Sequence, residues 1–121
     1  MFDPREINDR AFTYCARLER VKAYVDRNIS DDLSLRSAAR VAGLEQKYFS
    51  TFFHVKAGVR FKQWVSYRRV RRAQQLLSNS NHSITNVASA VGFQDVRTFE
   101  RTFKRVTSMT PIEYKKAVRP S

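Results

Sequence analysis

The stretch AVGFQDVRTFERTFKRVTSMTP, Ala90–Pro111, decides the fold of this chain. Three aromatic residues in it are spaced to suit one buried helical face: Phe93, Phe99 and Phe103. Four basic residues are threaded between them: Arg97, Arg101, Lys104 and Arg105. On a helix, residues three or four apart share a face, whereas residues two apart point to opposite sides. The pattern predicts a short helix that packs through its aromatic residues and carries positive charge on its outer face.

The composition favours a packed, mostly helical protein. Of 121 residues, 42% are hydrophobic and 12% aromatic, and there are only 3 Gly and 3 Pro. A disordered chain is poorer in aromatic residues and richer in glycine and proline. The length suits one domain or two very small subdomains.

The positive charge is placed unevenly along the chain. The net charge is +12, yet residues 1–32 carry six basic and seven acidic side chains. Residues 33–121 carry seventeen basic and four acidic ones. Such an excess on a compact domain favours a polyanionic partner, nucleic acid first and an acidic membrane surface second, over a merely solvated surface.

The cysteine count and the hydropathy pattern indicate a soluble, intracellular protein. Cys15 is the only cysteine, so the chain offers no internal disulfide. No stretch approaches the roughly 18 apolar residues that a membrane span needs. The first ten residues, MFDPREINDR, lack the apolar core of a signal peptide. We therefore expect no membrane partner and a cytoplasmic location.

A repeated pattern of helices fills most of the chain. A packing helix is expected over residues 16–28, and Ser34 then caps a short helix that ends at Gly43. A second helix, expected over residues 45–57, stops at Gly58, and a long helix follows over residues 61–78. Two short helices joined through a glycine turn are typical of a helix-turn-helix.

The same order returns after Ser83, which is expected to cap the next short helix. Thr110, Pro111 and Glu113 then predict the start of a last helix. At an offset of 49, Ala88 aligns with Ala39 and Gly92 with Gly43; at an offset of 50, Phe99 aligns with Phe49 and Phe103 with Phe53. The prediction is an all-α fold of about seven helices, with two helix-turn-helix subdomains joined by a long connecting helix. The expected divisions are an N-terminal extension (1–15), a first subdomain (16–60), the connecting helix (61–78) and a second subdomain (79–121).

The outer faces of the two second helices are the candidate DNA readers. An α-helix fits the major groove, where arginine pairs with guanine O6 and N7. Arg97 and Arg101 are therefore the leading specificity residues, with phosphate contact or a solvated charge as the alternatives. Glu100 could accept from cytosine N4, or pair within the helix with Lys104 or Arg97. In the first copy the outer face presents Lys47, Ser50 and Thr51.

The remaining polar residues of these units are assigned to the DNA backbone. Side chains at the later turns of such helices suit phosphates better than bases. The predicted phosphate set is Ser34, Arg36, His54, Lys56, Lys104 and Arg105. His54 is not expected to bind a metal, because His82 and Cys15 lie in unrelated segments. No metal site and no cofactor is predicted.

The stretch ITNVASAVGFQDVRTFERTFKRVTSMTPIEYKK, together with RRVRRAQQLL, carries a family resemblance. The chain resembles the DNA-binding domain of AraC/XylS-type bacterial transcription regulators over about 100 residues, from Ala16 to Lys116. The resemblance implies two recognition helices that enter successive major-groove segments on one face of the DNA, in the bacterial nucleoid. It places the base-reading positions on Lys47, Ser50, Thr51, Val96, Arg97 and Arg101.

Two positions depart from that family pattern. Ser108 stands where glycine is usual, so the turn before Thr110 is expected to be strained or differently built. Glu45 replaces a residue that often caps the helix. The basic run of the connecting helix is expected to meet phosphates or an acidic partner such as RNA polymerase, except that Arg69 packs within the fold. That run is Arg68, Arg69, Arg71 and Arg72.

The leading functional hypothesis is a sequence-specific transcription regulator, an activator or a repressor, that binds as one chain to an asymmetric promoter site. The alternative is a non-specific architectural DNA-binding protein, in which charge supplies nearly all of the affinity. An enzyme is disfavoured, because the sequence has no phosphate loop and too few glycines for a dinucleotide turn. A module that only binds proteins is disfavoured by the arginines of the outer face. We expect no ligand-sensing domain within these 121 residues, so the chain is either a stand-alone regulator or the DNA-binding part of a longer one.

Overall fold

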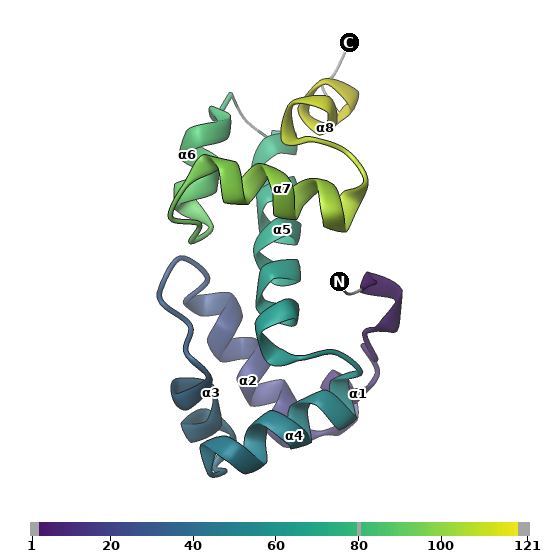
Figure 1. Cartoon of the computed structure of the whole chain (residues 1–121), viewed down its shortest axis with the longest axis vertical. Helices are drawn as coiled ribbons and strands as arrows, with labels where there is room; N and C mark the ends of the chain where they lie inside the picture. The colour runs from purple at the N-terminus through teal and green to yellow at the C-terminus, as the bar shows by residue number, and fades with distance from the viewer. Residues whose placement is uncertain (1–2, 80, 119–121) are drawn as a thin grey trace. The chain divides into compact units, whose positions relative to one another are not determined.

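The computed structural model describes residues 3–79 and 81–118 of the chain. Within these ranges it contains helices and no strands (Figure 1). The elements are η1 (Pro4–Glu6), α1 (Ala11–Tyr14), α2 (Ala16–Arg27), α3 (Leu35–Ala42), α4 (Gln46–Ala57), α5 (Phe61–Asn79), α6 (Ile84–Ala90), α7 (Val96–Thr107) and α8 (Pro111–Val118). The all-α prediction is confirmed, and the described residues hold eight α-helices where about seven were expected.

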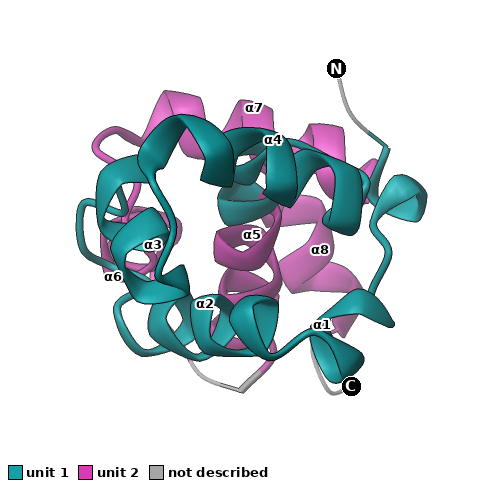
Figure 2. Cartoon of the chain, turned by 90° about the horizontal axis from the view of Figure 1, so that it is seen from below, with its two compact units in different colours: residues 1–66 teal, residues 67–121 magenta. Residues whose placement is uncertain are grey.

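The additional helix comes from the predicted extension, where η1 and α1 both form. The chain divides into two compact units, residues 1–66 and residues 67–121, coloured separately in Figure 2. This division falls inside α5, whereas the sequence pattern treats residues 61–78 as a connecting helix of its own. Residues 1–2, 80 and 119–121 of the predicted divisions lie outside the described residues.

Unit 1 (residues 1–66) is built on an aromatic core. Phe49 and Phe53 of α4 are fully buried, and Trp64 of α5 is 1% exposed. The Phe53 ring packs edge-on against Phe61 with centroids 5.4 Å apart. Aromatic rings bury large areas in few residues, which suits a unit of this size. The inner face of α2 is also buried, at Leu18, Val21 and Val25.

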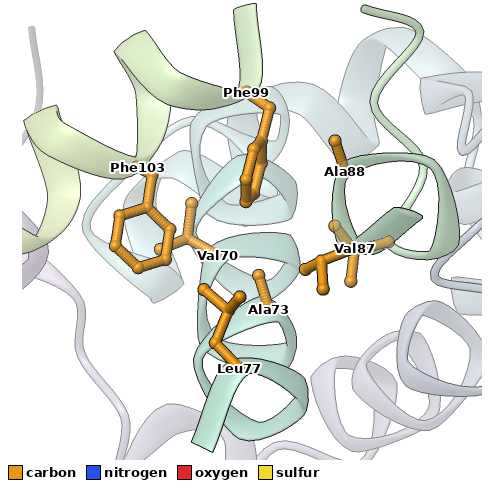
Figure 3. Packing of buried hydrophobic residues seen from close by; sticks show 8 residues of the cluster. Val70, Ala73, Leu77, Val87, Ala88, Phe99 and Phe103 are labelled. Carbon is orange, nitrogen blue, oxygen red and sulfur yellow. The ribbon is translucent and has the colours of Figure 1, made fainter. Parts of the chain in front are cut away.

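Unit 2 (residues 67–121) packs α7 onto α5 and α6. Figure 3 shows Phe99 and Phe103 pointing from α7 toward Val70 and Ala73 of α5. The full buried cluster is Val70, Ala73, Leu77, Val87, Ala88, Val91, Phe99 and Phe103. This confirms the prediction that the aromatic residues of the decisive stretch anchor its helix to a small core.

The helix ends follow the local signals in the sequence. The Ser37 backbone N–H donates to Ser34 Oγ over 3.1 Å, and the Asn86 N–H donates to Ser83 Oγ over 3.1 Å. At α8 the Glu113 N–H donates to Thr110 Oγ1, and the Thr110 N–H donates to Glu113 Oε1 over 2.8 Å, which closes a capping box. These caps confirm three predicted helix starts. Among the described residues, no helix combines the length and the apolarity of a membrane span.

Candidate nucleic-acid interface

The two copies share the same turn geometry, although they differ in sequence. After α3 the Leu44 N–H donates to the Ala39 carbonyl over 3.0 Å, and after α6 the Phe93 N–H donates to the Ala88 carbonyl over 2.9 Å. Both bonds span five residues around a left-handed glycine, Gly43 or Gly92. The residues that the predicted offset of 49 aligns therefore make the same backbone hydrogen bond in both turns. Each unit holds a helix-turn-helix, α3–α4 in unit 1 and α6–α7 in unit 2.

The second helix of each motif also ends in the same way. The Gly58 N–H donates to the His54 carbonyl over 3.0 Å, and the Ser108 N–H donates to the Lys104 carbonyl over 2.8 Å. Both residues are left-handed, with φ of 86° at Gly58 and 67° at Ser108. Ser108 thus keeps the geometry of a glycine turn without being glycine, which confirms the expected strain.

The face of α7 opposite the core is basic and exposed. Arg97, Arg101, Lys104 and Arg105 are all exposed, while Phe99 and Phe103 of the same helix are fully buried. An exposed guanidinium on a helix face is free to meet a base edge or a phosphate. The separation of the two faces explains why one short helix carries both aromatic and basic residues. In the described part of the chain, the half-buried Glu100 forms no ion pair with Arg97 or Lys104.

An acidic residue at the start of α7 was missed by the sequence reasoning. The Thr98 backbone N–H donates to Asp95 Oδ1 over 2.7 Å, and the Thr98 hydroxyl donates to Oδ2 over 3.0 Å. These hydrogen bonds, and secondarily the charges of Arg101 and Arg97, lower the pKa of the Asp95 carboxyl. The signal that could have found it is an aspartate three residues before a threonine at a helix start.

Val96 is the predicted base-reading residue that packs on the hydrophobic core of unit 2. Its side chain is half-buried and packs against the core cluster of unit 2. A side chain in that position has less surface to offer a thymine methyl than an exposed residue has. Val96 follows the cap residue directly, so it helps to seat the first turn of α7 on the core.

In unit 1 the three predicted base-reading residues line one open hollow at the start of α4. Its walls are Leu35, Glu45, Gln46, Lys47, Ser50 and Thr51. Lys47 and Thr51 are exposed and Ser50 is half-buried. Glu45 precedes the helix without a side-chain capping bond, as its departure from the family pattern predicts.

The first recognition helix carries one further exposed ring, Tyr48, which is 62% exposed beside Lys47. Sequence reasoning passed over Tyr48, since an aromatic residue within an apolar helix pattern is ordinarily assigned to the core. His54 and Lys56, on later turns of the same helix, are exposed, as is Arg36 of α3. Ser34 is half-buried, and its hydroxyl is engaged with Ser37.

The arginines of α5 in unit 2 fall into two groups. Arg71 and Arg72 are exposed and donate to the Gln74 and Gln75 side-chain carbonyls, each over 3.0 Å. Arg68 and Arg69 are half-buried, and each has a partner in the fold. The half-burial of Arg69 agrees with the prediction that its stem packs within the protein. Within the described residues, no group of three potential ligands could hold a metal ion.

Comparison with known proteins yields several relatives. The regulatory protein PocR of Salmonella typhimurium is 31% identical over 103 residues, which cover 85% of this chain and 34% of PocR. The raffinose operon transcriptional regulatory protein RafR of Pediococcus pentosaceus is 29% identical, over 79% of this chain and 35% of RafR. The chain thus spans about a third of the length of these two relatives.

A solved structure of the DNA-binding domain of AdpA, a global transcriptional factor, in complex with a target DNA, superposes with a TM-score of 0.79. The two chains are 27% identical, and the match covers 85% of this chain and 93% of that one. A helix-turn-helix domain model matches residues 38–117, about two thirds of the sequence. The family and the fold are those of transcriptional regulators and not of enzymes. The chain belongs to the AraC-type family of helix-turn-helix DNA-binding domains.

Proposed function

We propose that this chain is the DNA-reading part of a transcription regulator, and that it recognises an asymmetric promoter site through α4 and α7. The observation that carries the proposal is the two-faced build of α7, with Arg97 and Arg101 exposed opposite the buried Phe99 and Phe103. Membership of the AraC-type family and the DNA complex of the AdpA domain support DNA as the ligand.

The two recognition helices offer different chemistry, which is the reason to expect unlike half-sites. The α7 face carries Arg97 and Arg101, both suited to guanine, whereas α4 carries Lys47, Ser50 and Thr51. Because both motifs lie in one chain, a single copy supplies both readers. The two boxes of the site should then lie about one helical turn, ~10 base pairs, apart on the DNA.

Phosphate contacts complete the proposed interface. The exposed basic residues around the readers are Arg36, His54, Lys56, Lys104 and Arg105, with Ser34 at the start of α3. Such contacts fix the register of the protein on the duplex and make the affinity depend on salt. Arg71 and Arg72, exposed on α5, are the surface we propose for an acidic partner such as RNA polymerase. The proposed setting is the bacterial cytoplasm, on the nucleoid.

The net charge of +12 favours a second candidate, a non-specific architectural protein. The two candidates differ in how much of the affinity for DNA remains at high salt, because non-specific binding is almost wholly electrostatic. Selection of the purified chain on a randomised duplex of about 30 base pairs, one that spans two boxes a helical turn apart, at two salt concentrations separates them. A motif with two unlike boxes supports the regulator. Binding without any motif, lost steeply with salt, supports the architectural protein.

A further inference from the structure

We propose that the N-terminal segment, residues 3–14, is a positioning element of the first recognition helix, α4. The segment was expected only as an extension of the fold, yet it lies at the end of α4 where the chain turns into α5 (Figure 1). Three independent contacts join it to that helix. The proposal rests on the proposed function, because it assigns to the segment a part in reading DNA.

The first contact caps the carboxyl end of α4. The Asn8 backbone N–H donates to the Ala57 carbonyl over 2.8 Å, and Asn8 Nδ2 donates to the Lys56 carbonyl over 3.3 Å. The last four carbonyls of a helix have no partner within the helix itself. One residue, far away in sequence, therefore satisfies two of these four groups and fixes the position of α4 along its axis.

The second contact reaches the inner face of the same helix. The Phe12 ring meets Phe53 of α4 edge-on, with centroids 6.0 Å apart, and stacks on Trp64 at 5.0 Å with an interplanar angle of 10°. Phe12 is 6% exposed and Ala11 beside it is fully buried. Because Phe53 lies opposite the outer face of α4, a ring wedged against it resists rotation of the helix about its axis.

The third contact closes the corner between the segment and Gly58. A Cβ built on Gly58 would lie 2.3 Å from the Glu6 carbonyl oxygen, so the backbone of the segment approaches the helix end without space for a side chain. Two hydrogen bonds also stabilise η1, the turn that contains Glu6. The Arg5 backbone N–H donates to Asp3 Oδ1 over 2.9 Å, and the Asp3 N–H donates to Glu6 Oε1 over 3.3 Å.

Among the described residues, no segment distant in sequence donates to the end carbonyls of α7, the second recognition helix. At the end of α7 the Ser108 N–H, next along the chain, donates to the Lys104 carbonyl over 2.8 Å, and the Thr107 hydroxyl bonds back to the Phe103 carbonyl over 2.9 Å within the last turn. Both recognition helices therefore have a local bond at this end, and α4 has in addition the two bonds from Asn8. A change at Asn8 should therefore disturb reading by α4 and leave reading by α7 intact.

The test compares Asn8→Asp with Asn28→Asp. Asn28 Nδ2 donates to the Tyr24 carbonyl over 2.8 Å at the end of α2, so both variants add one negative charge and remove one side-chain bond at a helix end of unit 1. For each protein, the affinity ratio of matched to mismatched duplex is measured separately in the two boxes of the selected site. The box in which Lys47→Ala loses its base preference is the one that α4 reads. The box in which Arg101→Ala loses its base preference is the one that α7 reads. This ratio does not depend on the folded fraction of the protein.

We expect Asn8→Asp to lower the ratio in the α4 box by about three- to tenfold, the scale of one hydrogen bond, and to leave the α7 box unchanged. Asn28→Asp should change neither ratio. Equal losses in both boxes, or the same losses from Asn28→Asp, would overturn the proposal, because they would reduce the segment to general support of the fold. Phe12→Leu keeps an apolar side chain but removes the ring from the inner face of α4. It should therefore also lower the ratio in the α4 box and leave the α7 box unchanged.

Amide hydrogen exchange of the free protein provides a readout without DNA. Asn8→Asp should speed exchange in the last turns of α4 and leave α7 unchanged, since local opening follows the loss of local bonds. If the wild-type chain shows no base preference on any duplex, the proposed function fails and exchange alone decides whether the segment holds α4. Unchanged exchange in Asn8→Asp would overturn the positioning role in either case.

Discussion

Asp95 and Thr98 close the amino end of α7 with two hydrogen bonds, one from the Thr98 backbone N–H over 2.7 Å and one from its hydroxyl over 3.0 Å. Both carboxylate oxygens are therefore engaged at the start of α7, whose outer face is basic. A charged acceptor at this place satisfies an orphan N–H group and complements the helix dipole. Among the described residues the Asp95 carboxylate forms no ion pair with Arg97 or Arg101, and both arginines are exposed.

This cap should make stability depend on pH in a defined window. The folded protein holds the pKa of Asp95 below its ordinary value of 3.8, through the Thr98 hydrogen bonds first and the nearby arginines second. A depressed carboxyl pKa stabilises the fold fully above the ordinary value, and the gain is lost as pH falls through the folded-state pKa. Urea unfolding at several pH values should show wild type and Asp95→Asn converging only under acid conditions.

Glu113 shares this acid window, because Thr110 lowers its pKa in the same way. Glu113→Gln is therefore the matched control, and each single variant should remove only part of the acid sensitivity. A constant difference between wild type and Asp95→Asn from neutral pH into acid would show that the charge of Asp95 adds nothing to the cap.

The strained turn after α7 should be open to improvement by a single substitution. Ser108 has φ of 67°, a conformation that costs an L-residue roughly 1–2 kcal/mol and costs glycine nothing. Ser108→Gly should raise the free energy of unfolding by about 0.5–1 kcal/mol, since the greater freedom of glycine in the unfolded chain offsets part of the gain. Equilibrium urea unfolding measures it.

Gly58 occupies the equivalent turn in unit 1 and supplies the opposite control. Gly58→Ala should destabilise the fold, because its Cβ would lie 2.3 Å from the Glu6 carbonyl and its φ of 86° favours glycine. If Ser108→Gly is neutral or harmful, the serine hydroxyl must contribute a contact that outweighs the strain of its backbone.

A hydrogen bond between α5 and α8 gives a third prediction. Ser78 Oγ lies 2.8 Å from the Gln74 carbonyl and 3.1 Å from the Tyr114 hydroxyl. A serine hydroxyl has one proton, which Ser78 gives to the carbonyl, so Tyr114 is the donor in the second bond. Tyr114→Phe should cost about 1 kcal/mol in unfolding free energy. In a Ser78→Ala background the same substitution should cost much less, and equal costs in both backgrounds would contradict the bond.

Much of the fold can be predicted from the sequence, because its signals are local. The caps Ser34, Ser83 and Thr110 each begin a helix where the pattern places one. The buried pair Phe99 and Phe103 follows from helical spacing alone. Periodicity and capping depend on residues within one or two turns, so they are visible without tertiary structure.

The structure of the N-terminal segment could not be predicted in this way. The Asn8 N–H binds the Ala57 carbonyl, which lies far away in the sequence, and the Phe12 ring packs on Phe53 and Trp64. Long-range contacts of this kind leave no periodic trace in a segment of a dozen residues. The reading residues of the interface remain predictions, since exposure of a side chain such as Arg97 shows that it is available and not what it binds.

The base-reading role of Arg101 can be tested by its effect on specificity. Arg101 is exposed one turn after Arg97 on the outer face of α7, and a bidentate arginine–guanine pair is lost entirely on truncation. Arg101→Ala should cost about 1–3 kcal/mol on the selected site and relax the preference at one base pair. Titration against the matched duplex and its three single-base variants measures both effects.

Lys104 offers the matched control, since it is exposed on the next turn of the same helix and is assigned to phosphate. A lysine that meets only phosphate strengthens binding to every sequence and releases a counterion on binding. Lys104→Ala should therefore weaken all duplexes about equally and reduce the slope of log affinity against log salt by about one. If Arg101→Ala also weakens the binding of all duplexes equally and reduces the slope by the same amount, Arg101 contacts a phosphate. Arg97 is then the reader of the α7 box.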